Sequence, residues 1–430
     1  MFGGIAYCEE EDMSFDMMER VRQGLSRRQF LAGALAGGAA LTMTDKLALA
    51  KQIATGRTPS AQDIRGVGVQ PGIVLMALNE NPIGPSNHAL QAIAENMFKI
   101  NRYGFGRGEL IPALAAADGV ELPAPPQQQP GGDEFFRRRP PTPYLITASS
   151  SQVLELIALA YLSKGGGELV EADLGYLDLA QTGEFYNKEM GIPTNVIKVP
   201  VTKDYRHDLP AMLKAITPKT TMVVITNPNN PTGTLMSYQE LSDFVAKVPK
   251  NVLVVIDEAY IHFVREPNYR TAISLATSNE NVIVVRTFSK VYAMPAMRLG
   301  YGVSSQTIQQ KLRFYMTGGP NMLAEVAGVA AIKDLDHVRM SQEVVWSFRD
   351  RCYDEFKKLG LEYIPSQSNF MMVNVSKDAM AVVREMRKRG VMVSVRAREK
   401  MPTWIRVSSG TEAETEVFLH TLKEVLNSTI

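Results

Sequence analysis

From Tyr144 onward, short apolar runs alternate with amphipathic segments, and this alternation strongly limits the folds open to the chain. The apolar runs are rich in Val and Ile, as buried strands are, and the segments between them have helical spacing. Such a pattern favours an α/β domain with a mostly parallel sheet covered by helices on both faces. The expected strands are 144–147, 168–172, 195–199, 221–226, 251–258 and 281–287, and clear helical segments are 151–163 and 237–248.

The N-terminal residues have a different character. Arg27-Arg28 precede an apolar run rich in small residues (30–44), and Ala-Leu-Ala at 48–50 supplies an A-x-A cleavage site. This order is typical of a secretory signal peptide, and the run is too short and too rich in Ala and Gly for a membrane anchor. The paired arginines resemble a twin-arginine signal. The alternative is an amphipathic N-terminal helix that happens to contain two arginines.

Cysteine content bears on the export route. Removal of residues 1–50 removes Cys8 and leaves Cys352 alone, so the mature chain forms no internal disulfide. A protein that folds in an oxidising space often uses disulfides, whereas a protein that folds in the cytoplasm does not. We therefore expect folding in the cytoplasm and export of the folded protein to the periplasm by the twin-arginine route. If the signal is not used, the protein stays in the cytoplasm.

The remainder of the chain is organised into two domains. Its 430 residues, 45% of them hydrophobic, suffice for two cores, and the strand–helix alternation ends near residue 311. A Pro/Gln-rich segment with a basic cluster (120–143) is expected to be an inserted surface loop. The expected regions are the signal peptide (1–50), an N-terminal arm that joins the small domain (51–105), a large domain (106–310) and a small α+β domain (311–430).

Charge and hydropathy exclude several partners. Lys+Arg (46) and Asp+Glu (45) nearly cancel, so no nucleic-acid-binding face is expected. No apolar run beyond residue 50 is long enough to span a bilayer, so no stable membrane anchor is expected. The histidines have neither Cys partners nor ligand spacing, so no metal site is expected. They are His88, His207, His262, His337 and His420.

Unusual residues follow four of the expected strands. These are Ala148–Gln152 ("ASSSQ"), Asn227–Gly233 ("NPNNPTG"), Asp257–Tyr260 ("DEAY") and Ser289-Lys290 with Arg298 beyond. Ligands of parallel sheets bind at the carboxyl ends of strands, and a helix N-terminus suits a phosphate. Taken singly, Asp257 could be a helix cap, Lys290 a solvated lysine and 148–152 an N-cap. Together they predict one pocket for an aldehyde cofactor with a pyridine ring and a phosphate tail.

The order and spacing of these motifs resemble the fold-type I pyridoxal-phosphate (PLP) aminotransferases, and most of all their histidinol-phosphate aminotransferase branch. The resemblance runs from about Leu75 to the end of the chain. It implies the type I PLP-dependent transferase fold, with a mostly parallel seven-stranded sheet and a smaller α+β domain, and PLP as the cofactor. The motifs that carry it are 77–86, 101–104, 227–233, 254–263, 286–302 and 404–411.

The resemblance implies roles around the cofactor. Lys290 would form the Schiff base with PLP and later carry a proton. Asp257 would pair with the pyridine nitrogen and keep the ring an electron sink. Asn230 and Tyr260 would hydrogen-bond the ring hydroxyl. The phosphate would be shared by Ser149, Ser150, Ser151, Thr287, Ser289 and Arg298.

It also implies roles around the substrate. Arg406 would grip the substrate carboxylate in a bidentate pair, and Asn369 resembles the asparagine that supports this arginine. Asn79 would lie near the substrate. Tyr103 resembles a tyrosine that reaches the phosphate of the neighbouring subunit, which implies a homodimer.

The chain departs from the family pattern in two places. The family usually stacks an aromatic residue of a "PTYG"-like stretch on the pyridine ring, whereas this chain has "EADLGYLD" over 171–178. Leu174 then fills that position, so either Tyr176 stacks through a shifted loop or the packing is aliphatic. The 120–143 insertion is also foreign to the family. Export argues against histidine biosynthesis, because histidinol phosphate is a cytoplasmic intermediate.

The expected function is transfer of an amino group between an L-amino acid, or an amine like histidinol phosphate, and a 2-oxo acid. Other PLP-dependent activities share such a pocket, so a decarboxylase, lyase or racemase is the first alternative. A non-catalytic exported protein with this fold is the second. The candidate side chains for catalysis are all present, which argues against the second alternative.

Overall fold

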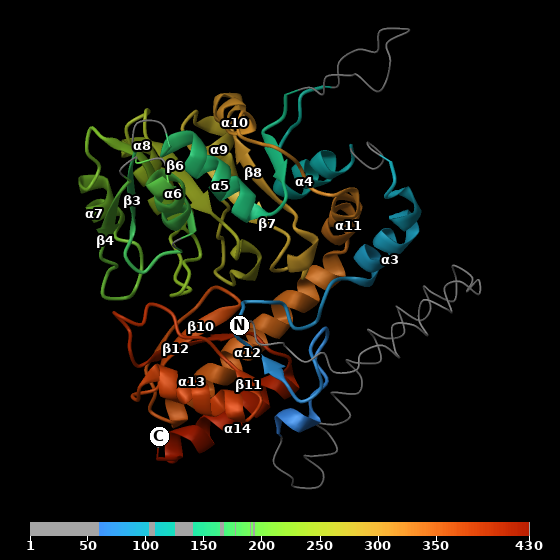
Figure 1. Cartoon of the computed structure of the whole chain (residues 1–430), viewed down its shortest axis with the longest axis vertical. Coiled ribbons are helices and arrows are strands. Elements are labelled where there is room, and N and C mark those ends of the chain that lie inside the picture. The colour runs from blue at the N-terminus through green and yellow to red at the C-terminus, as the bar shows by residue number, and fades with distance from the viewer. Residues whose placement is uncertain are drawn as a thin grey trace, which may run out of the picture.

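The computed structural model describes residues 60–102, 108–124, 141–163, 167–176, 178–189, 191 and 194–429. The expected signal peptide, Tyr103 and most of the 120–143 insertion lie outside these residues. Two domains are joined by a long helix, α12 (Leu335–Lys358), which runs from one to the other in Figure 1. None of the described helices is both long and apolar enough to cross a membrane.

The large domain is built on a seven-stranded sheet in the order β2-β8-β7-β6-β5-β3-β4. All neighbours pair in parallel except those of β8, which is antiparallel to both β2 and β7. The strands are β2 (Tyr144–Thr147), β3 (Glu168–Ala172), β4 (Asn195–Val199), β5 (Thr220–Thr226), β6 (Leu253–Asp257), β7 (Val282–Thr287) and β8 (Gly300–Ser304). The mostly parallel seven-stranded sheet is therefore confirmed.

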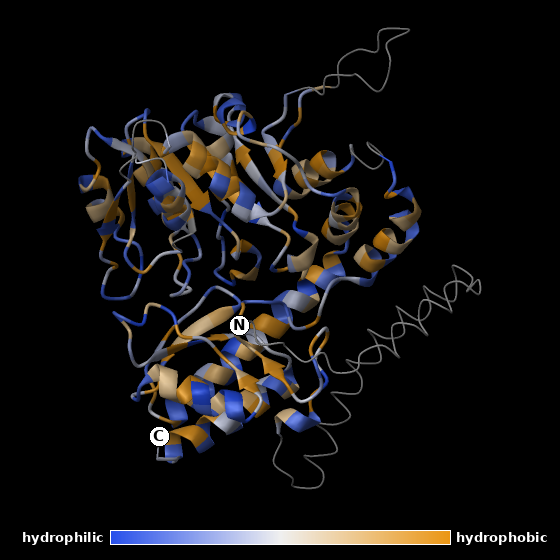
Figure 2. Ribbon diagram, in the orientation of Figure 1, coloured by the Kyte–Doolittle hydropathy of each residue, from blue (hydrophilic) through white to orange (hydrophobic). Residues whose placement is uncertain are grey.

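Helices cover both faces of this sheet because alternate strand residues point to opposite sides. Met222 and Val224 of β5 face a cluster that includes residues of α5, α6 and α10. Val223 and Ile225 face the larger cluster with α4, α7, α8, α9 and α11. Figure 2 shows the hydrophobic strands between helices whose outer faces are hydrophilic.

The helices of the large domain have the following bounds. They are α3 (Asn87–Asn96), α4 (Leu110–Asp118), α5 (Ser150–Tyr161), α6 (Asp178–Glu189), α7 (Leu209–Lys214), α8 (Tyr238–Lys247), α9 (Ile273–Ser278), α10 (Gln306–Arg313) and α11 (Met322–Lys333). Small buried residues of α11, such as Ala324 and Ala327, belong to the large core. The small domain therefore begins within α12, later than the boundary expected at residue 311.

The small domain contains an antiparallel sheet, in the order β12-β10-β9, and a parallel pair, β1-β11. Its core also takes in Ile64, Val74 and Met76 of the N-terminal arm. The chain then crosses from β1 to the large domain through residues 77–81. The elements are β1 (Val74–Leu75), β9 (Tyr363–Ile364), β10 (Phe370–Asn374), β11 (Val391–Met392), β12 (Trp404–Ser408), α13 (Ala379–Lys388) and α14 (Glu412–Asn427).

Candidate active site

The carboxyl ends of the central strands bring the predicted motifs to one edge of the sheet. Thr226 on β5 pairs with Asp257 on β6, and Asp257 pairs with Val285 on β7. Gly300 at the start of β8 pairs with Thr147 on one side and with Thr287 on the other. The segments that follow β2, β5, β6 and β7 therefore face a common space, as expected for a ligand site of a parallel sheet.

Beneath this edge, a buried ion pair ties two strands together. Glu258 accepts from Arg286 Nη2 at 2.7 Å, and Asp118 lies 3.6 Å from the same guanidinium. Burial and these two carboxylates act on Arg286, and the net effect is a raised pKa, because the carboxylate attraction outweighs the cost of burial. Glu258 points away from the site, whereas its neighbour Asp257 is buried at the end of β6. The ion pair therefore holds the end of β6 in place.

Lys290 follows β7 and points across the gap to the N-terminal segment. Its Nζ donates to the carbonyl of Asn79 at 3.0 Å. Burial and the positive charge of Arg406 lower the pKa of Lys290 to about 8, although Glu80 and Asp257 oppose this shift. An amine with such a pKa is partly neutral at neutral pH and can attack an aldehyde.

Three polar side chains surround Lys290 on the large domain. Asp257 is buried, and its Oδ1 accepts from the backbone N–H two residues on at 3.0 Å. Asn230 accepts from Arg406 Nη1 at 2.8 Å through Oδ1, so its Nδ2 is directed away from that arginine. The Tyr260 hydroxyl accepts from Asn79 Nδ2 at 3.0 Å. On the large-domain side, the site therefore has the carboxylate of Asp257 and two hydrogen-bonding groups, those of Asn230 and Tyr260.

The start of α5 forms an anion-binding turn. Ser149 precedes the helix, and its buried Oγ has no hydrogen-bond partner within the described part of the chain. A Cβ at Gly300 would lie 2.2 Å from the backbone N of Ser150, so only glycine lets β8 pass this close. Across Gly300, Thr287 Oγ1 donates to Ser289 Oγ at 2.9 Å. Free N–H groups at a helix start with nearby hydroxyls suit a phosphate.

Arg298 and Ser151 lie at the exposed rim of this turn. Arg298 has a left-handed backbone (φ 54°), and its guanidinium donates to the carbonyl of Pro295 at 2.8 Å. Together with the unpartnered Ser149 hydroxyl, the carboxylate of Asp257 and the amine of Lys290, this turn fits a cofactor with a phosphate, a pyridine nitrogen and an aldehyde.

Arg406 enters the site from β12 of the small domain. Its guanidinium is buried and donates to Asn230 Oδ1 and to the carbonyl of Ala77 at 3.0 Å. None of the ion pairs among the described residues involves Arg406, and its Nε has no hydrogen-bond partner there. Burial, with a contribution from Arg396, lowers the pKa of Arg406 to about 10. A buried guanidinium that lacks a carboxylate is suited to an anionic ligand.

Asn369 is placed differently from the expectation that it supports Arg406. Its Nδ2 donates to the carbonyls of Asn79 (3.0 Å) and Glu80 (3.3 Å), and no hydrogen bond joins it to Arg406. Asn369 and Arg406 instead donate to different carbonyls of the N-terminal segment, since Arg406 bonds that of Ala77. Asn79 itself is bonded to both Lys290 and Tyr260.

Leu174 and Tyr176, both in the loop after β3, have different surroundings. Leu174 is buried against the small domain, in a cluster with Met372 and Trp404. Tyr176 is half-buried and lies close enough to Arg406 to influence that guanidinium. The aliphatic side chain therefore serves the domain contact, and the aromatic one lies on the side of the site.

Sequence reasoning missed Glu80, Arg396 and Ser408. Ser408 lies inside the motif 404–411, but its importance comes from its contact with Asn79.

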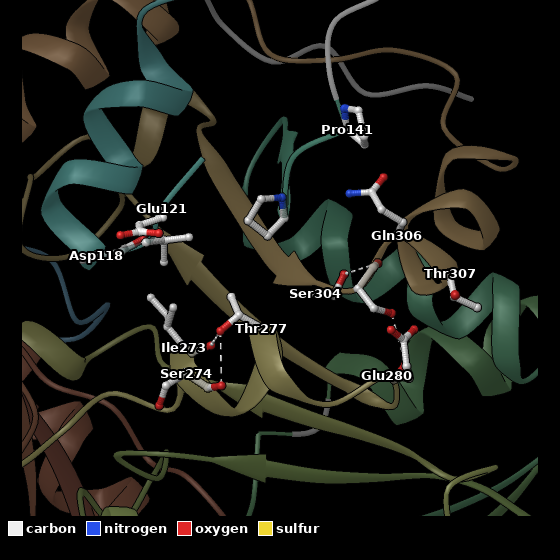
Figure 3. Close-up of a pocket in the computed structure, with 14 residues that line it drawn as sticks. Asp118, Glu121, Pro141, Ile273, Ser274, Thr277, Glu280, Ser304, Gln306 and Thr307 are labelled. Atoms are coloured by element: carbon white, nitrogen blue, oxygen red, sulfur yellow. Dashed lines mark hydrogen bonds between the residues drawn. The ribbon is translucent and has the colours of Figure 1, made fainter. Parts of the chain in front are cut away.

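Residues 118–121, α9 and the start of α10 line a separate cavity of about 570 Å³, which Figure 3 shows. It contains none of the site residues predicted from the sequence and lies at the opposite edge of the sheet, where β8 ends.

A lysine of lowered pKa at a strand end, a buried aspartate, an anion-binding helix start and a buried arginine together define an enzyme that works through an aldehyde cofactor. Residues 188–422 match the family "Aminotransferase class I and II". The chain is 37% identical over 365 residues to the histidinol-phosphate aminotransferase of Moorella thermoacetica, covering 84% of this chain and 87% of the relative. The chain belongs to the class I and II aminotransferase family.

Further relatives support this assignment to the family. The histidinol-phosphate aminotransferase of Akkermansia muciniphila is 36% identical over 374 residues, covering 86% of this chain and 94% of the relative. The crystal structure of the Sinorhizobium meliloti enzyme of that name, in complex with pyridoxal-5'-phosphate, superposes with a TM-score of 0.71 at 25% identity, covering 83% of this chain and 91% of that one. The protein is a PLP-dependent aminotransferase.

The lowered pKa of Lys290 predicts how cofactor uptake depends on pH. Only the neutral amine attacks the PLP aldehyde, so the rate of cofactor binding to the apoenzyme should rise with pH and level off above about pH 8. Stopped-flow absorbance of apoenzyme mixed with PLP measures this rate. A midpoint near 10.5, the ordinary value for a lysine, would contradict the environment described for Lys290.

Proposed function

We propose that this aminotransferase acts on L-amino acids and 2-oxo acids whose carboxylate is bound by Arg406. The observation that supports this proposal is the buried guanidinium of Arg406, which lacks a carboxylate partner and shares Asn230 with the cofactor side of the site. Both half-reactions use substrates with a carboxylate next to the reacting carbon. One arginine can therefore orient the amino donor and the oxo acceptor in turn.

The residues near Lys290 are proposed to hold PLP as follows. The hydroxyls of Ser149, Thr287 and Ser289 and the backbone N–H of Ser150 would bind the phosphate, with Ser151 and Arg298 at its exposed rim. Asp257 would keep the pyridine nitrogen protonated, and Asn230 and Tyr260 would donate to the ring hydroxyl. PLP supplies an electron-withdrawing ring that stabilises negative charge at the substrate Cα. Lys290 would bind the aldehyde and move the proton at that carbon.

Tyr176 is the residue proposed to cover the pyridine ring. Its half-buried ring lies near Arg406, whereas Leu174 is committed to the domain contact. An aromatic ring on the pyridine face would exclude water and limit ring rotation. On this proposal the missing aromatic residue at position 174 does not weaken cofactor binding.

A phosphorylated amine is the second candidate substrate. The curated relatives are named histidinol-phosphate aminotransferases. Arg396, which influences both Arg406 and Tyr260, adds a second positive charge that suits a phosphate better than a carboxylate. Arg396 is exposed at the mouth of the site, so it could also serve the distal carboxylate of a dicarboxylic substrate.

A panel of amino donors tests both candidates. Holoenzyme is mixed with each L-amino acid and with histidinol phosphate, and conversion of lysine-bound PLP to pyridoxamine phosphate is followed by absorbance. Rapid conversion by an L-amino acid supports the carboxylate proposal. Conversion by histidinol phosphate alone would replace it by the second candidate. Loss of carbon dioxide without pyridoxamine phosphate would instead indicate a decarboxylase.

A homodimer is also proposed. Three large apolar side chains, Met97, Phe98 and Ile100, are exposed in a short segment that precedes Tyr103 in the sequence. Large apolar side chains exposed close together in the sequence are consistent with a protein interface. Light scattering should give the mass of a dimer, and Phe98→Glu should give a monomer. A monomeric wild-type protein at micromolar concentration would rule the dimer out.

Export by the twin-arginine route is proposed from residues 1–50. The support is the order of Arg27-Arg28, the apolar run 30–44 and the Ala-Leu-Ala site. Fusion of these residues to a reporter that folds in the cytoplasm should place the reporter in the periplasm. Replacement of both arginines by lysine should retain it in the cytoplasm. A reporter that stays in the cytoplasm with the unaltered segment would contradict the proposal.

A further inference from the structure

Asn79 is held in an unusual conformation at the centre of the site. Its φ of 55° is in the left-handed region, which non-glycine residues seldom adopt without compensating contacts. The side chain and both backbone polar groups are hydrogen-bonded: the carbonyl accepts from Lys290 Nζ and from Asn369 Nδ2, each at 3.0 Å. Asn79 therefore connects the small domain with the lysine of the large domain.

The hydroxyl of Ser408 fixes this conformation. Ser408 Oγ accepts from the backbone N–H of Asn79 at 2.8 Å and donates to Asn79 Oδ1 at 3.0 Å. Both bonds are buried. Because a hydroxyl has a single proton, its donation to Oδ1 decides which end of the Asn79 amide faces Ser408.

The other end of the amide then faces Tyr260. Asn79 Nδ2 donates to the Tyr260 hydroxyl oxygen at 3.0 Å, so this hydroxyl is an acceptor in that bond. The proton of Tyr260 remains for another partner, and no described residue accepts it. The hydrogen bonds therefore run in one direction, from Ser408 to Asn79, from Asn79 to Tyr260, and from Tyr260 into the space beside Lys290.

We propose that Ser408 is a positioning residue that sets the direction of these hydrogen bonds, so that Tyr260 donates its proton to the ring hydroxyl of the cofactor. This inference rests on the proposed role of Tyr260. Without the Ser408 hydroxyl, Asn79 Oδ1 loses its donor, and the amide can turn over and accept the Tyr260 proton instead. Tyr260 would then no longer stabilise the ionised ring hydroxyl.

The test uses the visible band of lysine-bound PLP, whose pH midpoint depends on stabilisation of the ionised ring hydroxyl. The holoenzyme with Ser408→Ala should show a midpoint higher than wild type by about one pH unit, the effect of one lost hydrogen bond to a charged group. The charged groups that face Tyr260, namely Lys290, Asp257, Arg406 and Arg396, are unchanged by this substitution.

Ser409 provides a matched control. Its Oγ is also buried but has no hydrogen-bond partner within the described chain. Ser409→Ala therefore removes the same kind of atom without breaking the hydrogen bonds that join Ser408, Asn79 and Tyr260. Ser409→Ala should keep the wild-type pH midpoint of the band. Ser408→Thr retains the hydroxyl, so its midpoint should also equal that of wild type. Ser408→Cys, a weak donor of similar size, should raise it and serves if the alanine variant does not fold.

A double substitution separates a hydrogen-bond role from a merely structural one. Tyr260→Phe should raise the midpoint by itself, and adding Ser408→Ala should raise it no further, because the effect passes through Tyr260. An unchanged midpoint in Ser408→Ala or Ser408→Cys, an equal shift in Ser409→Ala, or additive shifts in the double variant would overturn the inference. If wild type shows no lysine-bound PLP band, it is the proposed function that has failed.

Discussion

Lys290→Ala should abolish transamination, with a fall in rate of about 10⁴-fold or more, and should remove the visible band of lysine-bound PLP. The reason is that one amine performs two tasks, binding of the aldehyde and movement of the proton at the substrate Cα. PLP can still enter the site and be held at its phosphate, so the variant should bind PLP reversibly, and dialysis should remove it.

The variant should remain folded. Lys290 has a lowered pKa because burial disfavours its charge, so its removal does not break a stabilising ion pair. Circular dichroism and the thermal midpoint of the apoenzyme check this point. Lys311→Ala, at an exposed lysine that packs on the ring of Tyr161, is the control and should keep full activity. Retention of the band in Lys290→Ala would assign the cofactor to another lysine.

Arg406→Lys should reduce kcat/KM for carboxylate substrates by about 10³-fold, as expected for loss of two charge-assisted hydrogen bonds. Lysine keeps the positive charge but offers no planar pair of donors, and it also leaves Asn230 Oδ1 without its 2.8 Å donor. The loss should be much smaller for an amine that lacks a carboxylate, since that substrate never makes the missing contacts.

Steady-state kinetics of the two substrate types provide the measurement. Arg384→Gln, at an exposed arginine of α13, is the control and should leave both unaffected. Equal losses for the carboxylate substrate and the amine would show that Arg406 organises Asn230 rather than the substrate. No loss for either would remove Arg406 from the binding site.

The sheet could be predicted from sequence because its central parallel strands β5, β6 and β7 are runs rich in Val and Ile. The strands expected at 144–147, 168–172 and 195–199 have those same bounds in the structure. β8 was missed because its Gly300 and Gly302 lack side chains that would give a strand pattern. Gly300 is required by the close approach to Ser150, a contact visible only in three dimensions.

Site residues could be predicted from the sequence where a single local motif determines their position in the fold. Asp257 ends β6, Arg406 lies within β12 and Lys290 follows shortly after β7, so the neighbouring strand fixes the position of each. The contact between Asn79 and Ser408 joins positions 329 residues apart, and no local pattern reveals it. The same reason explains Asn369, whose motif placed it in the site, whereas its actual partners are carbonyls of the N-terminal segment.

The most direct test of the active site is to find the lysine that carries PLP. Holoenzyme is reduced with borohydride, which fixes PLP to its lysine, then digested and sequenced by mass spectrometry. The structure predicts the pyridoxyl group on Lys290, in the segment between β7 and β8. A pyridoxyl group on any other lysine, with Lys290 unmodified, would contradict the placement of the active site at this edge of the sheet.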